Sequence, residues 1–582
     1  MKLAQDIQQL IEGDVAYDAE TLASRSIDWS IFHIPPQLVV FPKHTADIQA
    51  VMRYVHDHQS EYPGLSVTAR AAGTDMTGGP LNTGIILDTT RYMQGIHEVV
   101  LSTQFPEQYS FYGHAYNIAG YARALPGTWY RDFERATLEQ GLIMPCYPGS
   151  RDMCAIGGMV ANNGAGEKTL KYGQNKDFVH ELSVVGPAGD TYTCAPLTYR
   201  EVLENDAQQD YEGHVYRRTY ACLKEHWHLI QSKKPRTSKN AAGYLLWEVL
   251  QGTDSFEAFE QGQGFFTLAP LHVGAQGTLG VIAEIMYKLV HEQPAHDLLV
   301  IYVRDIARVP ELVDRLMQHD LEMLEMYDDH TFKIGIKFFK DFLKDKGFWG
   351  AIKYSIRFLP EVWMALTQGI PKLIVLAELT GPTEADVNQK TRQLAASLGD
   401  LNMSIRTILR DPQEEKFWDF RHDSFKLLSE HSKETRASGK GTRTAPFIDD
   451  IAINPEHLPE YLPRLIPILD EYKLLYTIAG HLGNGNFHII PLMTLDEIGE
   501  GDRLLEISDR VYALALEYGA SITAEHNDGI VRTPYLEQQF GAEMVALFAE
   551  IKDIFDPHHL CNPGKKVGGT KDDFKKWIAR NV

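Results

Sequence analysis

The sequence is poor in cysteine and lacks any long apolar run. Its five cysteines are scattered, and no two of them form a CxxC pair; they lie at positions 146, 154, 194, 222 and 561. This spacing excludes an iron–sulfur cluster or a zinc knuckle built from neighbouring thiols, and it fits a reducing compartment better than a disulfide framework. No run reaches the roughly 18 apolar residues that a membrane-spanning helix needs. Because the N-terminus also lacks an apolar signal region, a cytoplasmic location is expected.

Basic residues are also in short supply. The chain carries 56 Lys and Arg against 78 Asp and Glu, which gives a formal net charge of −22 at pH 7. An acidic surface repels phosphate backbones, so nucleic acid is not expected as a partner. The remaining composition is that of a soluble globular protein, and 582 residues are enough for two or three domains.

The first half of the chain mixes strand and helix patterns. Residues 36–41 form an apolar run, which a proline separates from an amphipathic helix with Thr45 as its expected N-cap. Residues 177–194 alternate around Pro187–Asp190, which predicts a β-hairpin that turns at these four residues. A further β-rich run covers residues 277–290. These patterns predict α+β layers.

A different pattern begins at about residue 296. The segments 296–316 and 371–398 each start with a buried strand and continue as an amphipathic helix. Two such units predict a separate sheet with helices on one of its faces. Towards the end of the chain, a helix is expected to stop at Asp556 and Pro557.

Two loops are rich in small residues. The first, "RAAGTDMTGG" at 70–79, follows a short strand, and the second, residues 146–178, holds six glycines in 33 residues. Small residues let backbone N–H groups approach an anion closely, as a pyrophosphate requires, although one such loop alone is more often a plain turn. The first loop is not the GxGxxG that opens a nicotinamide-binding Rossmann unit. Together the two loops predict a large phosphate-bearing ligand.

Histidines bracket a run of glycine and asparagine in "AGHLGNGNFHIIP", residues 479–491. Alone, this stretch can be a glycine turn before a strand, with one histidine hydrogen-bonded in the core. Seven extended residues span roughly 23 Å, so His481 and His488 reach one ion only if the chain folds back between them. The later stretch "ITAEHNDG" adds Glu525 and His526. Two imidazoles and a carboxylate make a divalent site with open positions, suited to zinc or manganese.

Seven ordered motifs between about residues 30 and 566 resemble those of the FAD-linked D-2-hydroxyacid dehydrogenases, a family of the vanillyl-alcohol-oxidase type. The motifs are "VVFPKHTADIQAV", "RAAGTDMTGG…GIILDTTRY", "YPGS…AIGGMVANNGAG…KYG", "GAQGTLGVIAEI", "GHLGNGNFH", "AEHNDGIVRTPYL" and "FDPHHLCNPGK". The resemblance implies a two-part FAD-binding domain over residues 1–292, divided at about residue 95. It also implies an α+β cap domain with its own antiparallel sheet over 293–515, and a C-terminal segment, 516–582, that returns to the FAD domain.

The resemblance also implies where the flavin lies. The pyrophosphate falls on the loop Arg70, Ala71, Ala72, Gly73, Thr74, Asp75 and Met76, and the flavin is lined by Pro148, Gly149, Ser150, Ile156, Gly157, Gly158, Asn162 and Gly166. Ile282 falls beside the adenine and Asn562 beside the isoalloxazine. Ala71 and Ala72 replace glycines that are usual in the family, and Gln276 replaces a common acid, but neither change removes a backbone donor. No linking histidine or cysteine is evident, so noncovalent FAD is expected.

By the same resemblance His481, His488 and Glu525 are metal ligands and His526 is the catalytic base, with Asn484 and Asn527 as departures from the family pattern. Arg421 stands where the family carries a substrate arginine; a surface ion pair is the alternative. The implied reaction oxidises a D-2-hydroxy acid, with D-lactate preferred, to the 2-oxo acid. The ion binds the substrate oxygens, the base takes the hydroxyl proton and the hydride passes to flavin N5.

Two other functions stay open at this point. Two histidines and a glutamate could serve a zinc-dependent hydrolase, with His526 as its general base. The chain could also be the flavin-bearing subunit of a larger 2-hydroxyacid oxidase complex. A yellow protein would argue against the first alternative, and turnover by the isolated chain would argue against the second.

Reduced flavin would need an external electron acceptor, such as a quinone or a cytochrome, because the scattered cysteines cannot relay electrons. Residues 332–366 are basic and aromatic within an acidic chain. This composition predicts either reversible docking on the inner face of a membrane or ordinary amphipathic helices of the cap.

Overall fold

A computed structural model describes residues 2–102, 118–329, 331, 369–401, 403–408, 417, 442–495 and 499–579. Two of the sequence predictions lie outside these residues: the basic and aromatic segment 332–366 and the substrate arginine Arg421.

The first sheet has four strands in the order β1-β2-β4-β3, of which the last three are parallel: β1 (Asp14–Ala16), β2 (Leu38–Phe41), β4 (Ile85–Asp88) and β3 (Val67–Arg70). All four residues of β2 are buried, as an apolar run in a parallel sheet predicts. The helix α3 (Thr45–Asp57) follows β2 and packs its apolar stripe beneath the sheet.

The predicted N-cap of α3 was wrong by one residue. The cap position belongs to His44, whose side chain makes no capping hydrogen bond. The carboxylate of Asp47 acts instead, because its Oδ2 accepts the backbone N–H groups of Lys43 at 2.8 Å and Gly13 at 3.0 Å. The start of the helix is therefore tied to β1 and its neighbours by a side chain inside the first turn.

The second sheet is antiparallel, in the order β5-β6-β12-β8-β9, with β7 beside β12: β5 (Ile96–Leu101), β6 (Gly120–Ala124), β7 (Leu142–Ile143), β8 (Val179–Val185), β9 (Thr191–Cys194) and β12 (Val281–His291). The predicted hairpin is confirmed, since β8 pairs with β9 and the N–H of Gly186 donates to the carbonyl of Asp190 across the turn. The helices α9 (Tyr211–Glu225) and α12 (Ala269–His272) bury apolar side chains against this sheet.

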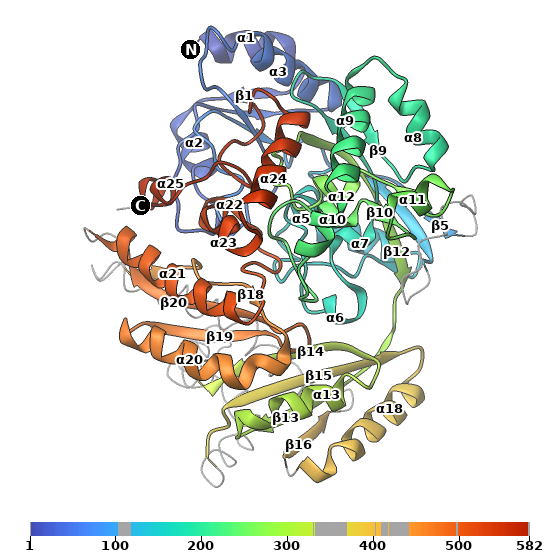
Figure 1. Ribbon diagram of the computed structural model, residues 1–582, viewed down its shortest axis with the longest axis vertical. Helices are drawn as coiled ribbons and strands as arrows, with labels where there is room; N and C mark the ends of the chain where they lie inside the picture. Colours follow the sequence, from blue (N-terminus) through green and yellow to red (C-terminus); the bar gives the residue numbers. More distant parts are fainter. Residues whose placement is uncertain are drawn as a thin grey trace, which may run out of the picture.

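A third sheet, here called the cap sheet, is also antiparallel. Its order is β16-β13-β15-β14-β19-β20-β17, with β18 beside β20: β13 (Ala295–Val303), β14 (Leu321–Asp328), β15 (Leu373–Gly381), β16 (Ser404–Ile408), β17 (Thr442–Thr444), β18 (Ile451–Ala452), β19 (Leu475–His481) and β20 (Asn486–Thr494). It lies in the lower half of Figure 1. The predicted separate antiparallel sheet is therefore confirmed.

Four helices cover one face of the cap sheet: α13 (Val309–Leu316), α18 (Glu384–Ser397), α20 (Leu458–Glu471) and α21 (Glu500–Glu517). Tyr476 and Ile478 of β19 pack into the core beneath them. The alternate residues of β19, namely Thr477, Ala479 and His481, face the other way and line a cavity. The prediction of helices on one face is confirmed; the opposite face carries a second buried apolar cluster and lines the cavity at β19 and β20.

After the cap sheet, the chain returns to the first two sheets. The helix α24 (Ala542–Phe555) packs against α9, and the next residues reach the first sheet, where the N–H of Asn562 donates to the carbonyl of Val67. Figure 1 shows this final segment, in red, among the blue and green elements. As predicted, the helix stops where Asp556 and Pro557 follow it. The link from β12 to β13 spans only residues 292–294, and we keep 293 and 515 as proposed limits of the cap domain.

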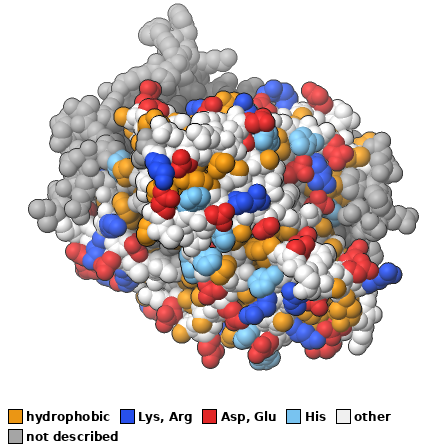
Figure 2. All heavy atoms as spheres, turned by 90° about the horizontal axis from the view of Figure 1, so that it is seen from above, with side chains coloured by type: hydrophobic (Ala, Val, Ile, Leu, Met, Phe, Trp, Pro, Cys, Tyr) orange, Lys and Arg blue, Asp and Glu red, His pale blue; other side chains and the backbone are white. Residues whose placement is uncertain are grey.

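The surface at the end remote from the cap sheet carries mixed charges. Figure 2 views this end and shows acidic and basic side chains interspersed, without a broad patch of one sign on that face. No helix in the described part of the chain has both the length and the apolarity needed to span a membrane.

Candidate active site

A cavity of about 580 Å³ lies between the small-residue loops and the face of the cap sheet opposite its four helices. Most of the predicted site residues line it: Arg70, Ala71, Ala72, Gly73, Thr74, Asp75, Met76, Pro148, Gly149, Ser150, Gly157, Gly158, Asn162, Ile282, His481, His488, Glu525 and His526. Two loops from the first half of the chain and two segments from the second half therefore meet around one space.

Three predicted flavin contacts lie outside the wall of this cavity. Ile156 is fully buried in the core, and Gly166 packs against the carbonyl of Tyr147. Asn562 is also fully buried, and its amide donates to the carbonyls of Gly79 and Gln276 while its oxygen accepts the hydroxyl of Thr68. The structure thus gives Asn562 the role of tying three segments together, because every polar atom of its side chain is already engaged.

The loop 70–79 is shaped from within by Asp75. Its Oδ2 accepts the N–H groups of Thr77 at 2.9 Å and Gly79 at 2.8 Å, and its Oδ1 accepts the amide of Asn162 at 2.7 Å. The carboxylate therefore turns back on its own loop and joins it to the helix α5 (Ile156–Asn162) of the second loop. The charge of Asp75 is engaged by these donors and does not have to face the ligand.

A guanidinium with one unsatisfied nitrogen faces this loop. Arg70 is buried, and its Nη2 donates to the carbonyl of Ile27 at 2.8 Å, but its Nη1 has no hydrogen-bond partner. A buried N–H of a guanidinium without a partner is costly unless a ligand completes it. Because Arg70 lines the cavity, an anionic group such as a pyrophosphate fits this position.

Glycine lets the two small-residue loops approach each other. A Cβ at Gly157 would lie 2.7 Å from Cβ of Pro126, and a Cβ at Gly158 would lie 3.2 Å from Cβ of Ala71. Ala71, which replaces a usual glycine, is therefore accommodated because its partner lacks a side chain. The wall on this side consists mainly of backbone and small side chains, as a bulky flavin nucleotide requires.

The two histidines of the cap sheet lie on one hairpin. The chain reverses through the turn 482–484 and Gly485, which has φ +62° and stands so close to the carbonyl of Ile453 that a Cβ would overlap it. The pairing of Ala479 with His488 places His481 on the same face as His488, and their ring centroids are 5.3 Å apart. The chain reversal expected from the sequence is confirmed.

The third segment of the site is the loop that carries Glu525 and His526. One oxygen of Asp450, Oδ2, accepts the backbone N–H groups of Ala524 at 2.9 Å, Glu525 at 2.9 Å and His526 at 2.7 Å. It also accepts the hydroxyl of Thr523 at 2.6 Å. A single buried carboxylate therefore fixes the conformation of a loop that has no regular secondary structure.

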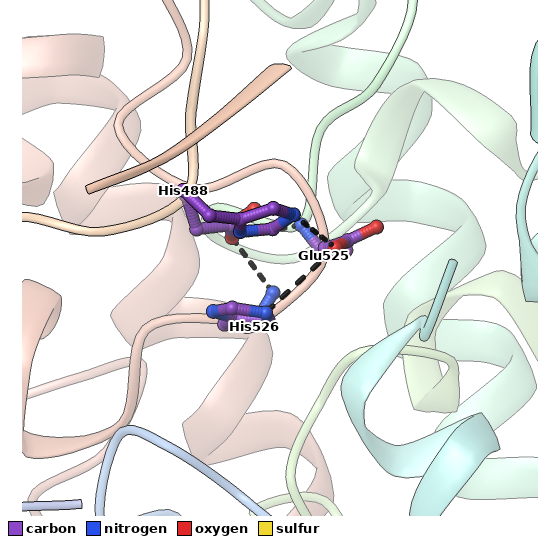
Figure 3. A group of neighbouring side chains, drawn as sticks. His488, Glu525 and His526 are labelled. Carbon is purple, nitrogen blue, oxygen red and sulfur yellow. Dashed lines mark hydrogen bonds and ion pairs between the residues drawn. The ribbon is translucent and has the colours of Figure 1, made fainter. Parts of the chain in front are cut away.

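Three imidazoles converge on one carboxylate oxygen. Oε1 of Glu525 lies 3.0 Å from Nε2 of His488, 3.4 Å from Nε2 of His481 and 3.7 Å from Nε2 of His526. Figure 3 shows the rings of His488 and His526 one above the other, both on the same side of Glu525. The other oxygen, Oε2, is 3.2 Å from Nζ of the fully buried Lys239. Glu525 therefore presents one oxygen to the imidazoles and one to an ammonium.

The opposite edge of each imidazole faces a carboxylate. Nδ1 of His481 is 2.5 Å from Oε1 of Glu325, while Nδ1 of His488 and Nδ1 of His526 are 3.2 and 3.0 Å from the two oxygens of Asp449. A carboxylate at Nδ1 favours a proton there and leaves the lone pair on Nε2, as in many metal sites. The donor set of two or three imidazoles and one carboxylate therefore fits a divalent ion such as zinc or manganese.

Charges within the site shift the proton affinities of its residues. Burial alone would raise the pKa of Glu525, but Lys239 and His481 hold it well below its ordinary value. Burial alone would lower the pKa of His488, yet Asp449 and Glu525 raise it to about 10. Burial likewise opposes the raised pKa of His526, which Asp450 and Asp449 produce. The carboxylates thus favour the protonated form of both imidazoles in the metal-free site. A bound ion would displace the Nε2 proton of an imidazole that serves as its ligand.

Several residues of the site were missed by the sequence predictions. Glu325, Asp449, Asp450 and Lys239 bind or orient the predicted ligands from other strands and loops. The adjacent pair Asp449 and Asp450, within an apolar stretch of the sequence, was the one signal that could have drawn attention to them. Asn484, one of the two departures from the family pattern, donates to the hydroxyl of Ser238 instead of joining the imidazoles.

Comparisons with known proteins bear on these features. Residues 36–195 match the family described as an FAD binding domain, and residues 293–566 match the C-terminal domain of FAD-linked oxidases. The chain belongs to the FAD-linked oxidases. This FAD-linked oxidase therefore matches both an FAD-binding domain and a C-terminal oxidase domain, and its FAD-binding domain is of the vanillyl-alcohol-oxidase type.

Relatives of this FAD-linked oxidase are distant. It is 26% identical to a D-2-hydroxyglutarate dehydrogenase of Pantoea ananatis over 95% of this chain and 50% of that protein, and it spans about half the length of the D-2-hydroxyglutarate dehydrogenases it matches. It is 23% identical to the glycolate oxidase subunit GlcD of Bacillus subtilis over 94% of this chain and 91% of that protein. A D-lactate dehydrogenase of Archaeoglobus fulgidus is 22% identical over 91% of both chains.

Solved structures share the fold. An alkyldihydroxyacetonephosphate synthase superposes with a TM-score of 0.62 at 12% identity, over 97% of this chain and 84% of that one. The 4-ethylphenol oxidase of Gulosibacter chungangensis superposes with a TM-score of 0.61 at 15% identity, over 98% and 97% of the two chains. At these identities the likeness concerns the fold alone.

Proposed function

We propose that this FAD-linked oxidase is a dehydrogenase that oxidises a D-2-hydroxy acid to the 2-oxo acid. The observation that carries the proposal is the convergence of three imidazole Nε2 atoms on Glu525 Oε1 in the cavity that the small-residue loops also line. A metal site and a flavin site that share one cavity are suited to remove a proton and a hydride from one alcohol.

The residues of the chain take separate roles in this proposal. When bound, FAD accepts the hydride at N5 and the divalent ion polarises the substrate hydroxyl. His481, His488 and Glu525 hold the ion. His526, whose Nε2 faces the same point, takes the hydroxyl proton as general base. Arg70 binds the pyrophosphate through the N–H that otherwise has no partner.

The wall beside the histidines supports a short substrate. Thr477, Ala479 and Ile490 line the cavity there, and all three are small or apolar. Among the described residues that line the cavity, Arg70 is the one Lys or Arg, and it lies in the pyrophosphate loop. Among these described residues, a second carboxylate, such as that of 2-hydroxyglutarate, would therefore meet no further cation. We accordingly propose D-lactate, with glycolate and D-2-hydroxyglutarate as the alternatives that the relatives' names supply.

Anaerobic titration of the purified protein tests the proposal. The flavin absorbance near 450 nm should bleach with D-lactate and not with L-lactate, and a chelator should abolish the bleaching while the flavin stays bound. Glycolate and D-2-hydroxyglutarate complete the panel. If none of the 2-hydroxy acids reduces the flavin in a metal-loaded protein, the proposed function is wrong. Bleaching by D-2-hydroxyglutarate alone would retain the reaction and correct the substrate.

The comparisons argue against one of the two alternative functions and support the other. The matches to both FAD-oxidase domains argue against the zinc-dependent hydrolase. The flavin-bearing subunit of a larger complex is supported by one relative, whose name is that of a glycolate oxidase subunit. Turnover of D-lactate by the isolated chain with an artificial acceptor would exclude a requirement for partners.

We also propose an external electron acceptor, a quinone or a cytochrome. The five cysteines are all buried and unpaired, and the metal-ligand clusters formed by the described residues include only one of them, Cys222. Docking of residues 332–366 on the inner face of a membrane would bring a quinone within reach. Co-sedimentation with anionic liposomes at low salt should fall when Lys337, Lys340 and Lys344 become Glu; unchanged binding would remove this segment as the anchor.

A further inference from the structure

A single carboxylate, that of Asp449, stands between two of the imidazoles. Its Oδ1 is 3.2 Å from Nδ1 of His488, and its Oδ2 is 3.0 Å from Nδ1 of His526. The two rings are nearly parallel, at an interplanar angle of 21° with their centroids 5.0 Å apart. Each ring therefore has one oxygen of the same carboxylate at its edge remote from Glu525.

Hydrogen bonds to its backbone carbonyl and to its side chain hold Asp449 in place. Its side chain is fully buried, its carbonyl accepts Nη2 of the fully buried Arg532, and its Oδ1 also accepts the N–H of Asp450 at 2.8 Å. Nη1 of the same Arg532 donates to the carbonyl of Asn527 at 3.1 Å. The guanidinium thus links the segment that carries Asp449 to the loop that carries His526, which fixes the separation of the two groups.

The carboxylate of Asp449 lies close to His526 without a well-aligned hydrogen bond between them. Oδ2 of Asp449 and Nδ1 of His526 are both buried and neither makes a hydrogen bond of acceptable angle, although they are only 3.0 Å apart. Two buried polar groups rarely stay unsatisfied beside each other, because each unmade hydrogen bond leaves a desolvated polar atom.

We propose that Asp449 is a positioning residue that sets the tautomer of both His488 and His526. A proton on each Nδ1, donated to Asp449, leaves a lone pair on each Nε2. For His488 that lone pair serves as a metal ligand, and for His526 it serves as the proton acceptor in the reaction of the proposed function, on which this inference rests. One carboxylate thereby orients a ligand of the ion and the base beside it, as the aspartate of a hydrolytic triad orients one imidazole.

The substitution Asp449→Asn tests the proposal, since an amide keeps the shape but has only one acceptor oxygen for two rings. The affinity for Co²⁺ or Zn²⁺, measured by titration of the metal-free holoprotein, should fall by about 10–100-fold. With the metal at saturation, the rate of flavin reduction by substrate should still fall by on the order of 10²–10⁴. The absorbance spectrum of the bound flavin should not change.

Two further variants separate positioning from general destabilisation. Asp297→Asn removes another buried carboxylate of the cap sheet, which accepts the hydroxyl of Thr391 at 3.1 Å and does not line the cavity. It should leave metal affinity and flavin reduction unchanged. Asp449→Glu keeps two acceptor oxygens and should recover part of the metal affinity that Asp449→Asn loses.

Wild-type metal affinity in a folded Asp449→Asn protein would overturn the proposal, as would equal losses in Asp449→Asn and Asp297→Asn. If Asp449→Asn does not fold, the comparison of Asp449→Glu with the wild type decides. The longer side chain displaces both acceptor oxygens from the rings, so a metal affinity below that of the wild type supports positioning and an unchanged one refutes it. The metal titration needs no substrate. Its outcome therefore stands even if no 2-hydroxy acid reduces the flavin, which would count against the proposed function alone.

Discussion

The two walls of the cavity use different parts of the chain. On the side of the first two sheets, loops 70–79 and 146–178 offer backbone and small side chains, and Arg70 supplies the charge. On the side of the cap sheet, three imidazoles, their carboxylate partners and Lys239 form a dense buried polar network. The first wall selects a ligand by shape and the second by charge and coordination, so changes in one wall should spare the function of the other.

The largest effect is expected from His526→Ala. Loss of a positioned general base should lower the rate of flavin reduction by substrate by on the order of 10²–10⁴ in stopped-flow measurements. Reduction by dithionite, which needs no base, should proceed as in the wild type. An unchanged rate with substrate would remove His526 from the mechanism, and loss of bound flavin would break the separation of the two walls.

A loss of most turnover, together with a clear change in composition, is expected from His488→Ala. Removing a direct ligand should weaken metal binding by more than the factor of about 10–100 that loss of an outer partner causes. Metal analysis and the flavin spectrum, read on the same sample, should show loss of metal with full retention of FAD. His481→Ala should behave alike. Wild-type activity of either variant in the presence of a chelator would contradict the metal site.

Gly158→Ala is expected to weaken FAD binding and to leave metal binding unchanged. Its Cβ would lie 3.2 Å from that of Ala71, so the two flavin loops would have to separate. Overpacking of this kind costs about 1–3 kcal/mol, which corresponds to roughly a 5- to 150-fold loss of FAD affinity if the loops yield. Gly399→Ala, where a Cβ meets nothing within 4 Å, is the matched control. Metal affinity should stay the same in both variants, and a loss of metal in Gly158→Ala would show that the walls are coupled.

The last effect concerns the pH dependence of folding stability and the helix α12, which packs against the second sheet. Burial lowers the pKa of His272 to about 3, and its Nε2 lies 2.9 Å from the hydroxyl of Tyr192. Because the unfolded state takes up the proton first, at about pH 6.5, His272 stabilises the fold above that pH, and this contribution declines as the pH falls towards 3 by about 1.4 kcal/mol per pH unit. In His272→Gln, which can still accept the hydroxyl, the melting temperature should depend less steeply on pH between 6.5 and 4. An identical slope would refute this assignment.

Local elements were predictable because their causes are local. The hairpin turn at Pro187–Asp190, the strand and helix units of the cap sheet and the stop at Asp556 all follow from residues within one or two turns of the chain. The N-cap at position 45 failed because a carboxylate inside the first turn, Asp47, took over the capping of the preceding backbone.

The residues that orient the histidines could not be predicted for the converse reason. Glu325 is 156 positions from His481, Asp449 is 39 from His488, and Lys239 is 286 from Glu525. No periodicity links positions so far apart; only the packing of β14 beside β19, and of the loops around them, brings them together. The resemblance supplied the ligands, whereas their partners required the fold.

The return of the chain to the first sheet has a consequence for the order of events during synthesis. Thr68 hydrogen-bonds to Asn562, 494 residues later in the chain. At about 5–20 residues per second, roughly 25–100 s separate the emergence of the two from the ribosome. Throughout that interval the edge of β3 lacks the segment around Asn562 that pairs with it, while the cap sheet can already be complete. Of the two domains, the flavin domain is thus the later one that a newly made molecule can finish, although its first strands are made before the cap sheet.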